Sequence, residues 1–188
     1  VQDNANALEG LMLVFKSINK FDSAAYYAGL FADNYQTVEH WRMAGDAYFE
    51  ALTFALDEVK LRQLATKTRE YYNKILDSGE NDLDIKNNIA MTHVEERINP
   101  MQGILMLRGI LEEDPQNEKA LFNMGRLSMV SGQFEIAVGR FETLTKYYPE
   151  NIEGQYWLGV CYFQIQDYKS ALNMFEKSLS LGLKPSGE

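Results

Sequence analysis

The side chains that most often carry out chemistry in proteins, histidine and cysteine, are few in this sequence. Its 188 residues include two histidines, His40 and His93, and one cysteine, Cys161. These residues do not have the short, paired spacing that is typical of metal ligands. A lone cysteine cannot form a disulfide within the chain, and Cys161 stands between apolar residues. We therefore interpret Cys161 as a small buried side chain and predict no metal site.

One histidine has an acidic neighbour at a spacing at which two side chains can meet on a helix. Glu96 follows His93 by three residues and can reach its ring, whereas Glu95 follows by two and points elsewhere. Such pairs are common on helix surfaces, so we interpret His93 as a solvated or helix-packing residue. Because glycine-rich phosphate loops are also absent from the sequence, we predict that the protein is not an enzyme and binds no cofactor.

The strongest pattern in the sequence is a segment that occurs twice between residues 117 and 183. Several of its residues return 34 positions later, as the pairs Gly125 and Gly159, Ala137 and Ala171, and Phe141 and Phe175. A fixed period of this length is typical of helical repeat proteins, in which each unit is a pair of helices. The sequence therefore predicts a stack of helical hairpins.

Residues 151–184 show what one such unit contains. An apolar run from Tyr156 to Phe163 predicts a first helix, and a polar break follows at residues 164–167. A second run, from Tyr168 to Leu179, keeps helical spacing. Neither helix could bury its apolar face alone, so each hairpin needs neighbours stacked against it.

These residues resemble the tetratricopeptide repeat (TPR), whose pattern has Leu-Gly at positions 7 and 8, Tyr at 11, Ala at 20 and an aromatic residue at 24. Counted from Ile152, the last repeat places Leu158, Gly159, Tyr162, Ala171 and Phe175 at these positions. The repeat before it places Gly125, Gly132, Ala137, Phe141 and Pro149 at positions 8, 15, 20, 24 and 32. The style of the sequence is similar to that of bacterial TPR proteins. The resemblance implies an all-α fold, a right-handed TPR solenoid (α–α superhelix) of about five helical hairpins.

We expect a single solenoid domain over residues 1–188, with repeats at about 5–36, 37–81, 82–117, 118–151 and 152–185. The second repeat is 11 residues longer than the normal unit, and its extra residues, around 51–66, contain no glycine or proline. Because these residues keep helical apolar spacing, we expect a lengthened hairpin that turns near Asp57, where the carboxylate can cap the second helix. A single long helix is the alternative.

The resemblance also implies where a partner would bind. In TPR solenoids, positions 2, 5, 9, 12 and 13 of each first helix line the concave groove. The partner-binding residues that we expect on this basis are Arg42, Phe49, Asn88, Lys119, Phe122, Arg126, Met129, Tyr156, Val160 and Phe163.

This expected groove changes character along the chain. The last two repeats place large apolar residues in it, although the TPR packing positions do not include Phe122, Met129, Tyr156 or Phe163. A solvent-facing apolar strip usually marks a contact site. The alternative is that neighbouring helices cover these side chains. Because acidic residues occupy the groove positions of the second and third repeats, we expect a protein or peptide with an apolar anchor and possibly a basic end.

Charge and hydropathy restrict the other classes of partner. The net charge of −9 argues against nucleic acid, which requires clustered lysine and arginine. No apolar run reaches 18 residues, so we predict no membrane span in this chain. The sequence begins with Val1, so a leader or anchor could precede it. The location is therefore unknown, and we expect a soluble protein, cytoplasmic or attached to the cell envelope through a missing N-terminal segment.

The end of the sequence suggests an alternative function. TPR arrays usually end in an extra helix with a polar outer face, and residues 184–188 do not have such a pattern. An apolar face made of Leu172, Met174 and Leu179 would then stay open. The alternative function is therefore a structural, self-assembling module that forms a homo-oligomer through its C-terminal repeat.

Overall fold

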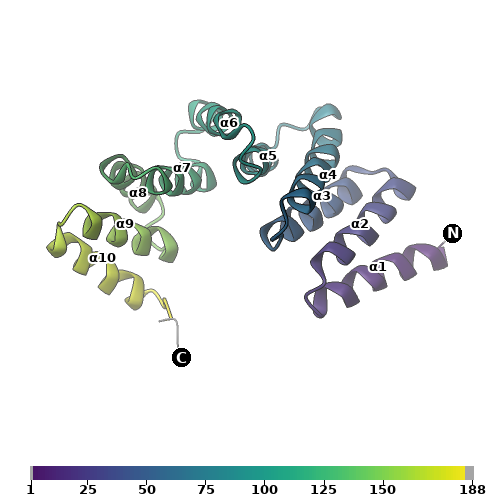
Figure 1. The fold of residues 1–188 in the computed structure, drawn as a ribbon, viewed down its shortest axis with the longest axis horizontal. Coiled ribbons are helices and arrows are strands. Elements are labelled where there is room, and N and C mark those ends of the chain that lie inside the picture. The colour runs from purple at the N-terminus through teal and green to yellow at the C-terminus, as the bar shows by residue number, and fades with distance from the viewer. Residues whose placement is uncertain (1, 185–188) are drawn as a thin grey trace. The chain divides into compact units, whose positions relative to one another are not determined.

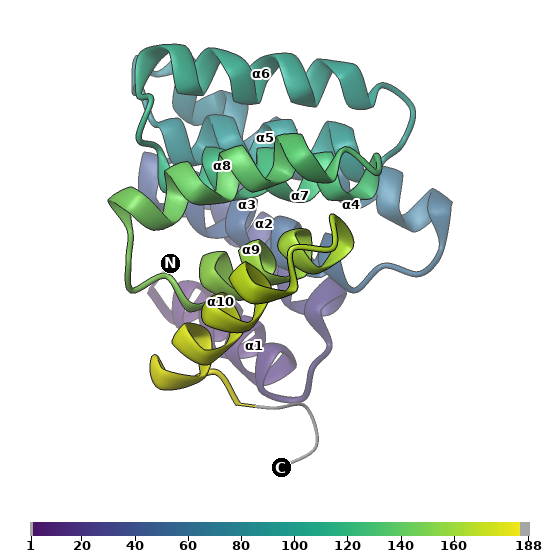
Figure 2. The ribbon, with the colours of Figure 1, turned by 90° about the vertical axis from the view of Figure 1, so that its left-hand side faces the viewer.

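The structure, a computed structural model, describes residues 2–184 and the side chains of residues 7–184. Within that range it contains α-helices and no β-strand, which confirms the all-α fold class (Figures 1 and 2). The prediction that residues 184–188 form no capping helix concerns, apart from Lys184, residues outside the described part. The ten helices of the described part are α1 (Gln2–Ser17), α2 (Phe21–Tyr35), α3 (Val38–Thr53), α4 (Glu58–Asp77), α5 (Leu83–Glu95), α6 (Pro100–Glu113), α7 (Glu118–Val130), α8 (Phe134–Tyr147), α9 (Ile152–Gln164) and α10 (Tyr168–Ser180).

The helices belong to two compact units. Unit 1 contains residues 1–106, unit 2 contains residues 107–188, and the boundary falls within α6. In sequence order the helices alternate with short turns, as expected for a series of hairpins. The assignment of one repeat to each hairpin, within a single domain, stays a prediction.

Unit 1 is held together by small residues that let its helices approach closely. Ala28 and Ala32 of α2 and Ala44 of α3 are completely buried beside Tyr71 of α4. A Cβ atom added to Gly45 would lie only 2.5 Å from the ring of Tyr72. The repeat glycine of this hairpin is therefore required by close packing against an aromatic ring.

The enlarged second hairpin turns where the sequence predicted. Helix α3 ends at Thr53 and α4 begins at Glu58, so a single long helix is excluded. The carboxylate of Asp57 accepts a hydrogen bond of 2.9 Å from the backbone N–H of Lys60. This bond satisfies one of the unpaired donors at the start of a helix and fixes the beginning of α4.

Unit 2 contains the two regular repeats, and its core repeats one contact. The ring of Phe141 from α8 packs against Gly125 of α7, and the ring of Phe175 from α10 packs against Gly159 of α9. An added Cβ would lie 2.7 Å from the first ring and 2.8 Å from the second. Because there is no side chain at these glycines, each helical pair can close around an aromatic ring.

Three helices of unit 2, namely α7, α9 and α10, start at a capping side chain. Asn117, Asn151 and Asp167 precede α7, α9 and α10, and each side chain accepts a hydrogen bond from the backbone N–H three residues later. Gly132, in the turn between α7 and α8, has a φ of +71°, which glycine adopts without strain. The turns are thus encoded by single residues.

Candidate partner-binding surfaces

The first candidate surface is a cavity in unit 1 formed by residues of α1, α2 and α3. This α1–α3 cavity has a volume of about 380 Å³. Four of the five groove positions of the second repeat line it, namely Glu39, Arg42, Asp46 and Glu50. Met12 and Leu13 of α1 and Met43 of α3 supply apolar walls. The sequence-based positions therefore come together in one cavity.

Two cations of the α1–α3 cavity are paired with carboxylates. Lys16 lies 2.7 Å from Glu50, and Arg42 lies 2.8 Å from Asp82, which precedes α5. Burial acts to raise the pKa of Asp82, but hydrogen bonds from the Ile85 N–H and from Arg42 outweigh it, and the pKa is lowered. The ion pair therefore holds Arg42 in place at the wall of the cavity.

A second set of polar contacts holds one remaining carboxylate of this cavity. The hydroxyl of Tyr72 donates a 2.7 Å hydrogen bond to Asp46, and the side-chain amide of Asn88 donates a 3.1 Å bond to the Tyr72 oxygen. Neither contact brings a positive charge to Asp46. The lining contains two cations, Lys16 and Arg42, and three carboxylates, Glu39, Asp46 and Glu50, so the cavity has a net negative charge.

Two predicted site residues of unit 1 have structural contacts of their own. Phe49 is partly buried and packs against the cluster that contains Tyr72, Ile75 and Ile89. Asn88 holds the hydroxyl of Tyr72 and so helps to orient Asp46. Neither residue lines the α1–α3 cavity, and only Asn88 is linked to it, through Tyr72 and Asp46.

Most side chains at the groove positions of the third repeat pack against other residues of the protein. Ile85 and Thr92 are buried, although they hold groove positions 2 and 9 of the TPR pattern. The guanidinium of Arg69 from α4 binds both carboxylate oxygens of Glu96 at 2.9 Å and also donates to Thr92. This part of the chain is a contact between α4 and α5.

His93 lies beside that ion pair. Burial and the nearby charge of Arg69 lower its pKa, and the charge of Glu96 only partly opposes them. The carboxylate of Glu96 binds Arg69 instead of His93: no hydrogen bond between Glu96 and the His93 ring is found among the described residues. His93 is a helix-packing histidine, one of the two interpretations that the sequence allowed.

In unit 2, helix α7 carries four of the predicted site residues. Lys119 and Arg126 are exposed. Phe122 and Met129 are only partly buried and pack against the core, and the ring of Phe122 meets that of Phe141 edge-on at 6.0 Å. Packing in α7 therefore uses Phe122 and Met129, although the TPR pattern does not count them among its packing positions.

Helix α9 carries the other three predicted residues. Tyr156 is partly buried between Trp157 and Phe175, with ring distances of 5.1 and 5.8 Å, and Val160 is partly buried. Phe163 is 53% exposed and meets Tyr168 of α10 edge-on at 5.5 Å. The open apolar surface of this hairpin is thus narrower than expected and is centred on Phe163 and Tyr168.

Sequence reasoning missed the residues that α1 contributes. Leu13 and Lys16 line the α1–α3 cavity from the irregular first repeat. Counted from Ala5, they stand at positions 9 and 12, so the same TPR numbering would have found them. Tyr168 was missed because it belongs to a second helix, for which the groove positions make no statement.

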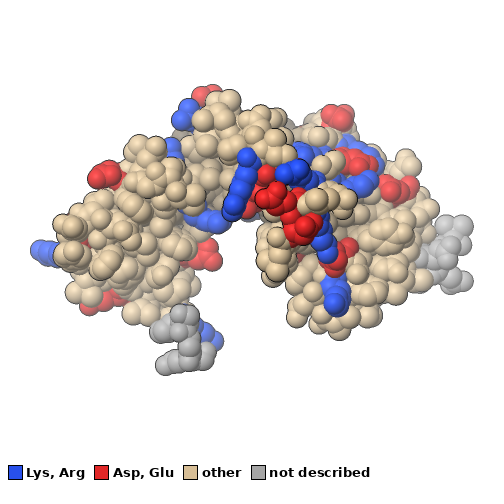
Figure 3. Space-filling view, in the orientation of Figure 1, with Lys and Arg blue, Asp and Glu red and all other residues tan. Residues whose placement is uncertain are grey.

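The distribution of charge differs between the parts of the surface. Figure 3 shows lysine, arginine, aspartate and glutamate gathered over α3, α4 and α5, whereas the visible surface of α9 and α10 is mostly uncharged.

Burial raises the pKa of the Cys161 thiol to about 11, so this thiol is neutral at ordinary pH. Among the described residues, no group of three or more His, Cys, Asp or Glu could hold a metal ion. None of the described helices is long and apolar enough to cross a membrane.

Comparisons with known proteins agree on the fold. Residues 122–187 match the sequence profile of the tetratricopeptide repeat family. The structure resembles TTC0263, a thermophilic TPR protein of Thermus thermophilus, with a TM-score of 0.66, 12% identity and coverage of 95% of this chain and 91% of that one. It also resembles MamA, with a TM-score of 0.61, 14% identity and coverage of 98% and 100%.

A further similar structure is YrrB, described as a TPR protein with an unusual peptide-binding site. The TM-score is 0.54 at 16% identity, and the alignment covers 93% of this chain and 84% of YrrB. No curated protein sequence matches this chain significantly. At these identities the likeness shows the fold, which is that of TPR proteins, and the match to the family profile covers residues 122–187.

Proposed function

We propose that this protein is a non-enzymatic scaffold that binds a peptide or helix of a partner protein in its TPR groove. One observation carries the proposal. Glu39, Arg42, Asp46 and Glu50, which stand at groove positions of the second repeat, line one cavity of about 380 Å³. A volume of this size accommodates one or two side chains of a partner.

The lining of the α1–α3 cavity favours a basic residue of the partner. Among the described residues, Glu39 and Asp46 form no ion pair within 4 Å, although the charge of Arg42 acts on Asp46, whereas Lys16 and Arg42 are paired with Glu50 and Asp82. Met12, Leu13 and Met43 offer apolar contact for the aliphatic part of a lysine or arginine side chain. Within unit 2, the exposed Phe163 separately offers an apolar contact to a partner.

A selection experiment tests this function. A library of random 12-residue peptides displayed on phage is panned against the full chain, and selected peptides are measured by fluorescence polarisation. We expect peptides with lysine or arginine beside apolar residues. Glu39→Gln with Asp46→Asn should weaken their binding about tenfold, which corresponds to roughly 1.4 kcal/mol, because both charges that attract the basic residue are removed. Asparagine keeps an oxygen that can accept the hydrogen bond from Tyr72.

The control changes the same amount of charge elsewhere. Glu135→Gln with Glu176→Gln alters exposed residues of α8 and α10 and should leave binding unchanged. Phe163→Ala tests the apolar contact separately. If the selected peptides bind the Glu39 and Asp46 variant as tightly as they bind the native chain, the α1–α3 cavity is not their binding site.

A second candidate function rests on the outer face of α10. Leu172 and Leu179 are 57% and 51% exposed, and Tyr168 on the same helix is also exposed. Met174 packs against the core of unit 2, so it contributes less to this face than the sequence suggested. Such a face supports self-association. Sedimentation velocity over a range of concentrations should then show a dimer that Leu172→Ser with Leu179→Ser abolishes, whereas a monomer at every concentration would exclude this candidate.

A further inference from the structure

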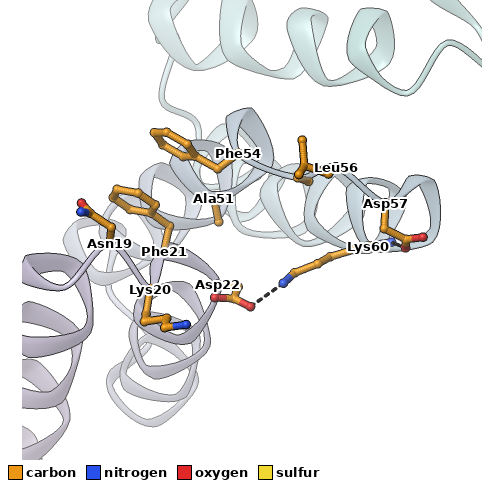
Figure 4. Close-up of a pocket in the computed structure, with 10 residues that line it drawn as sticks. Asn19, Lys20, Phe21, Asp22, Ala51, Phe54, Leu56, Asp57 and Lys60 are labelled. Carbon is orange, nitrogen blue, oxygen red and sulfur yellow. Dashed lines mark hydrogen bonds and ion pairs between the residues drawn. The ribbon is translucent and has the colours of Figure 1, made fainter.

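The lengthening of the second hairpin creates a surface that the groove does not use. Helix α4 has 20 residues, whereas α8 and α10, the second helices of the regular repeats, have 14 and 13. The added turns at the start of α4 lie beside the start of α2, where Lys60 contacts Asp22 at 2.5 Å (Figure 4). This ion pair lines two neighbouring cavities.

The larger of these two cavities lies between α2 and α4. This α2–α4 cavity has a volume of about 590 Å³. Tyr26 of α2, Tyr48 of α3 and Leu64 of α4 give it an apolar wall. The ring of Tyr48 stacks on that of Tyr71 at 5.7 Å, so this wall is fixed in position.

The rim of the α2–α4 cavity is basic in a chain whose net charge is −9. Lys60, Arg62 and Lys67 line it, and Asp22 is its only acidic lining residue among those described. Arg62 and Lys67 form ion pairs with exposed carboxylates of α4 itself, Glu58 at 3.3 Å and Glu70 at 2.8 Å. Exposed pairs of this kind contribute little free energy, so carboxylates of a partner can replace them.

The smaller cavity adds an apolar surface next to this basic rim. In this turn cavity, of about 370 Å³, the rings of Phe21 and Phe54 stack at 4.3 Å (Figure 4). Leu56, in the turn between α3 and α4, is fully exposed to solvent. The two cavities together therefore offer apolar contact on one side of Asp22 and Lys60 and positive charge on the other.

We propose that the α2–α4 cavity and the adjoining turn cavity bind an acidic segment of a protein partner. Carboxylates of that segment contact Arg62 and Lys67, and an apolar side chain beside them contacts Phe54 and Leu56. Charge complementarity selects this partner, because three cations line the α2–α4 cavity, whereas of the carboxylates paired with them only Asp22 lines it. The site is separate from the α1–α3 cavity and does not depend on the function proposed above.

The same phage selection on the full chain gives a direct test. We expect a second class of peptides, rich in aspartate and glutamate around an apolar residue. Arg62→Gln with Lys67→Gln should weaken these peptides about tenfold and leave the basic peptides unchanged. Lys60 is retained in this variant because its ion pair joins α4 to α2.

Two controls make the outcome specific. Lys146→Gln with Lys169→Gln removes the same charge from exposed positions of α8 and α10 and should leave the acidic peptides bound. Leu56→Ser should weaken them without altering the helical content measured by circular dichroism. Failure to select acidic peptides, or equal binding to the Arg62 and Lys67 variant, would overturn the proposal. The proposal would also be overturned, in favour of nucleic acid, if a 12-residue thymidine strand bound this site more tightly than the acidic peptides do.

Discussion

Two glycines of unit 2 show how a single position can control the packing of a hairpin. Gly125 and Gly159 stand on α7 and α9 where rings from α8 and α10 leave no room for a Cβ atom. Gly139 of α8 differs, because nothing lies within 4 Å of a Cβ atom built there. The two kinds of glycine have opposite effects on stability.

Alanine substitutions distinguish them. Gly125→Ala is expected to lower the free energy of unfolding by about 1–3 kcal/mol, because the new methyl group overlaps the ring of Phe141. Gly139→Ala is expected to raise it by about 0.5–1 kcal/mol, since alanine restricts the unfolded chain and favours helix. Urea titrations followed by circular dichroism measure both. Equal effects at the two positions would contradict the packing described for Gly125.

The buried thiol of Cys161 provides a test that depends on pH. Burial raises its pKa to about 11, above the value of about 9 for an exposed thiol. The neutral thiol therefore stabilises the folded state fully below pH 9, and this contribution is lost as the pH rises through 11. At pH 8 the folded chain should contain roughly a hundredfold less thiolate than the unfolded chain.

Reaction with Ellman's reagent measures this difference. Native protein should react slowly at pH 8, and protein unfolded in urea should react quickly. A native rate close to the unfolded rate would mean that Cys161 is accessible, against its complete burial.

At the scale of the helices, one ion pair joins the lengthened helix α4 to the atypical helix α5. Arg69 and Glu96 are both largely buried, and both carboxylate oxygens of Glu96 accept hydrogen bonds from the guanidinium. The same guanidinium also donates to Thr92, so one side chain of α4 holds two residues of the α5 hairpin. The pair therefore helps to hold the first helix of the third hairpin against the second helix of the second hairpin.

Removing the charge of Glu96 should lower the stability of the protein considerably more than removing the charge of an exposed glutamate. Glu96→Gln is expected to destabilise the protein by about 2 kcal/mol, because the buried guanidinium of Arg69 loses its counter-charge. Glu58→Gln, which affects the exposed pair with Arg62, is expected to change stability by less than about 0.5 kcal/mol. Thermal unfolding of the two variants compares them directly, and similar losses would show that burial does not strengthen the Arg69 pair.

At the scale of the whole molecule, a TPR chain is a linear series of hairpins. Stability in such a series is approximately the sum of the stability of each repeat and of its contacts with its neighbours. A local defect is therefore expected to weaken its own hairpin most. Unit 2 allows this to be examined, because it holds two regular repeats in sequence.

Amide hydrogen exchange tests this expectation on one variant. Gly159→Ala should reduce protection most in α9 and α10, where the added methyl group meets the ring of Phe175, and less in α7 and α8. Exchange monitored by mass spectrometry of peptic peptides resolves the two hairpins. A uniform loss of protection over unit 2 would mean that its four helices unfold as one cooperative body.

The sequence alone was sufficient for the parts of the protein that follow from local rules. The helix start after Asp57 was predicted because one capping side chain sets it, and the 34-residue period predicted the stack of helical hairpins. Four groove positions of the second repeat also line one cavity together, because TPR numbering reflects the direction of each side chain on its helix.

Only the tertiary structure decided which side chains remain available. Phe122 and Met129 pack partly against the core of unit 2, and Thr92 is buried beside Arg69. Burial depends on neighbouring helices, which the position of a residue within its own repeat does not specify. For the same reason the α2–α4 cavity could not be predicted, since it needs two helices to bring together residues such as Asp22 and Lys60, 38 residues apart in the sequence.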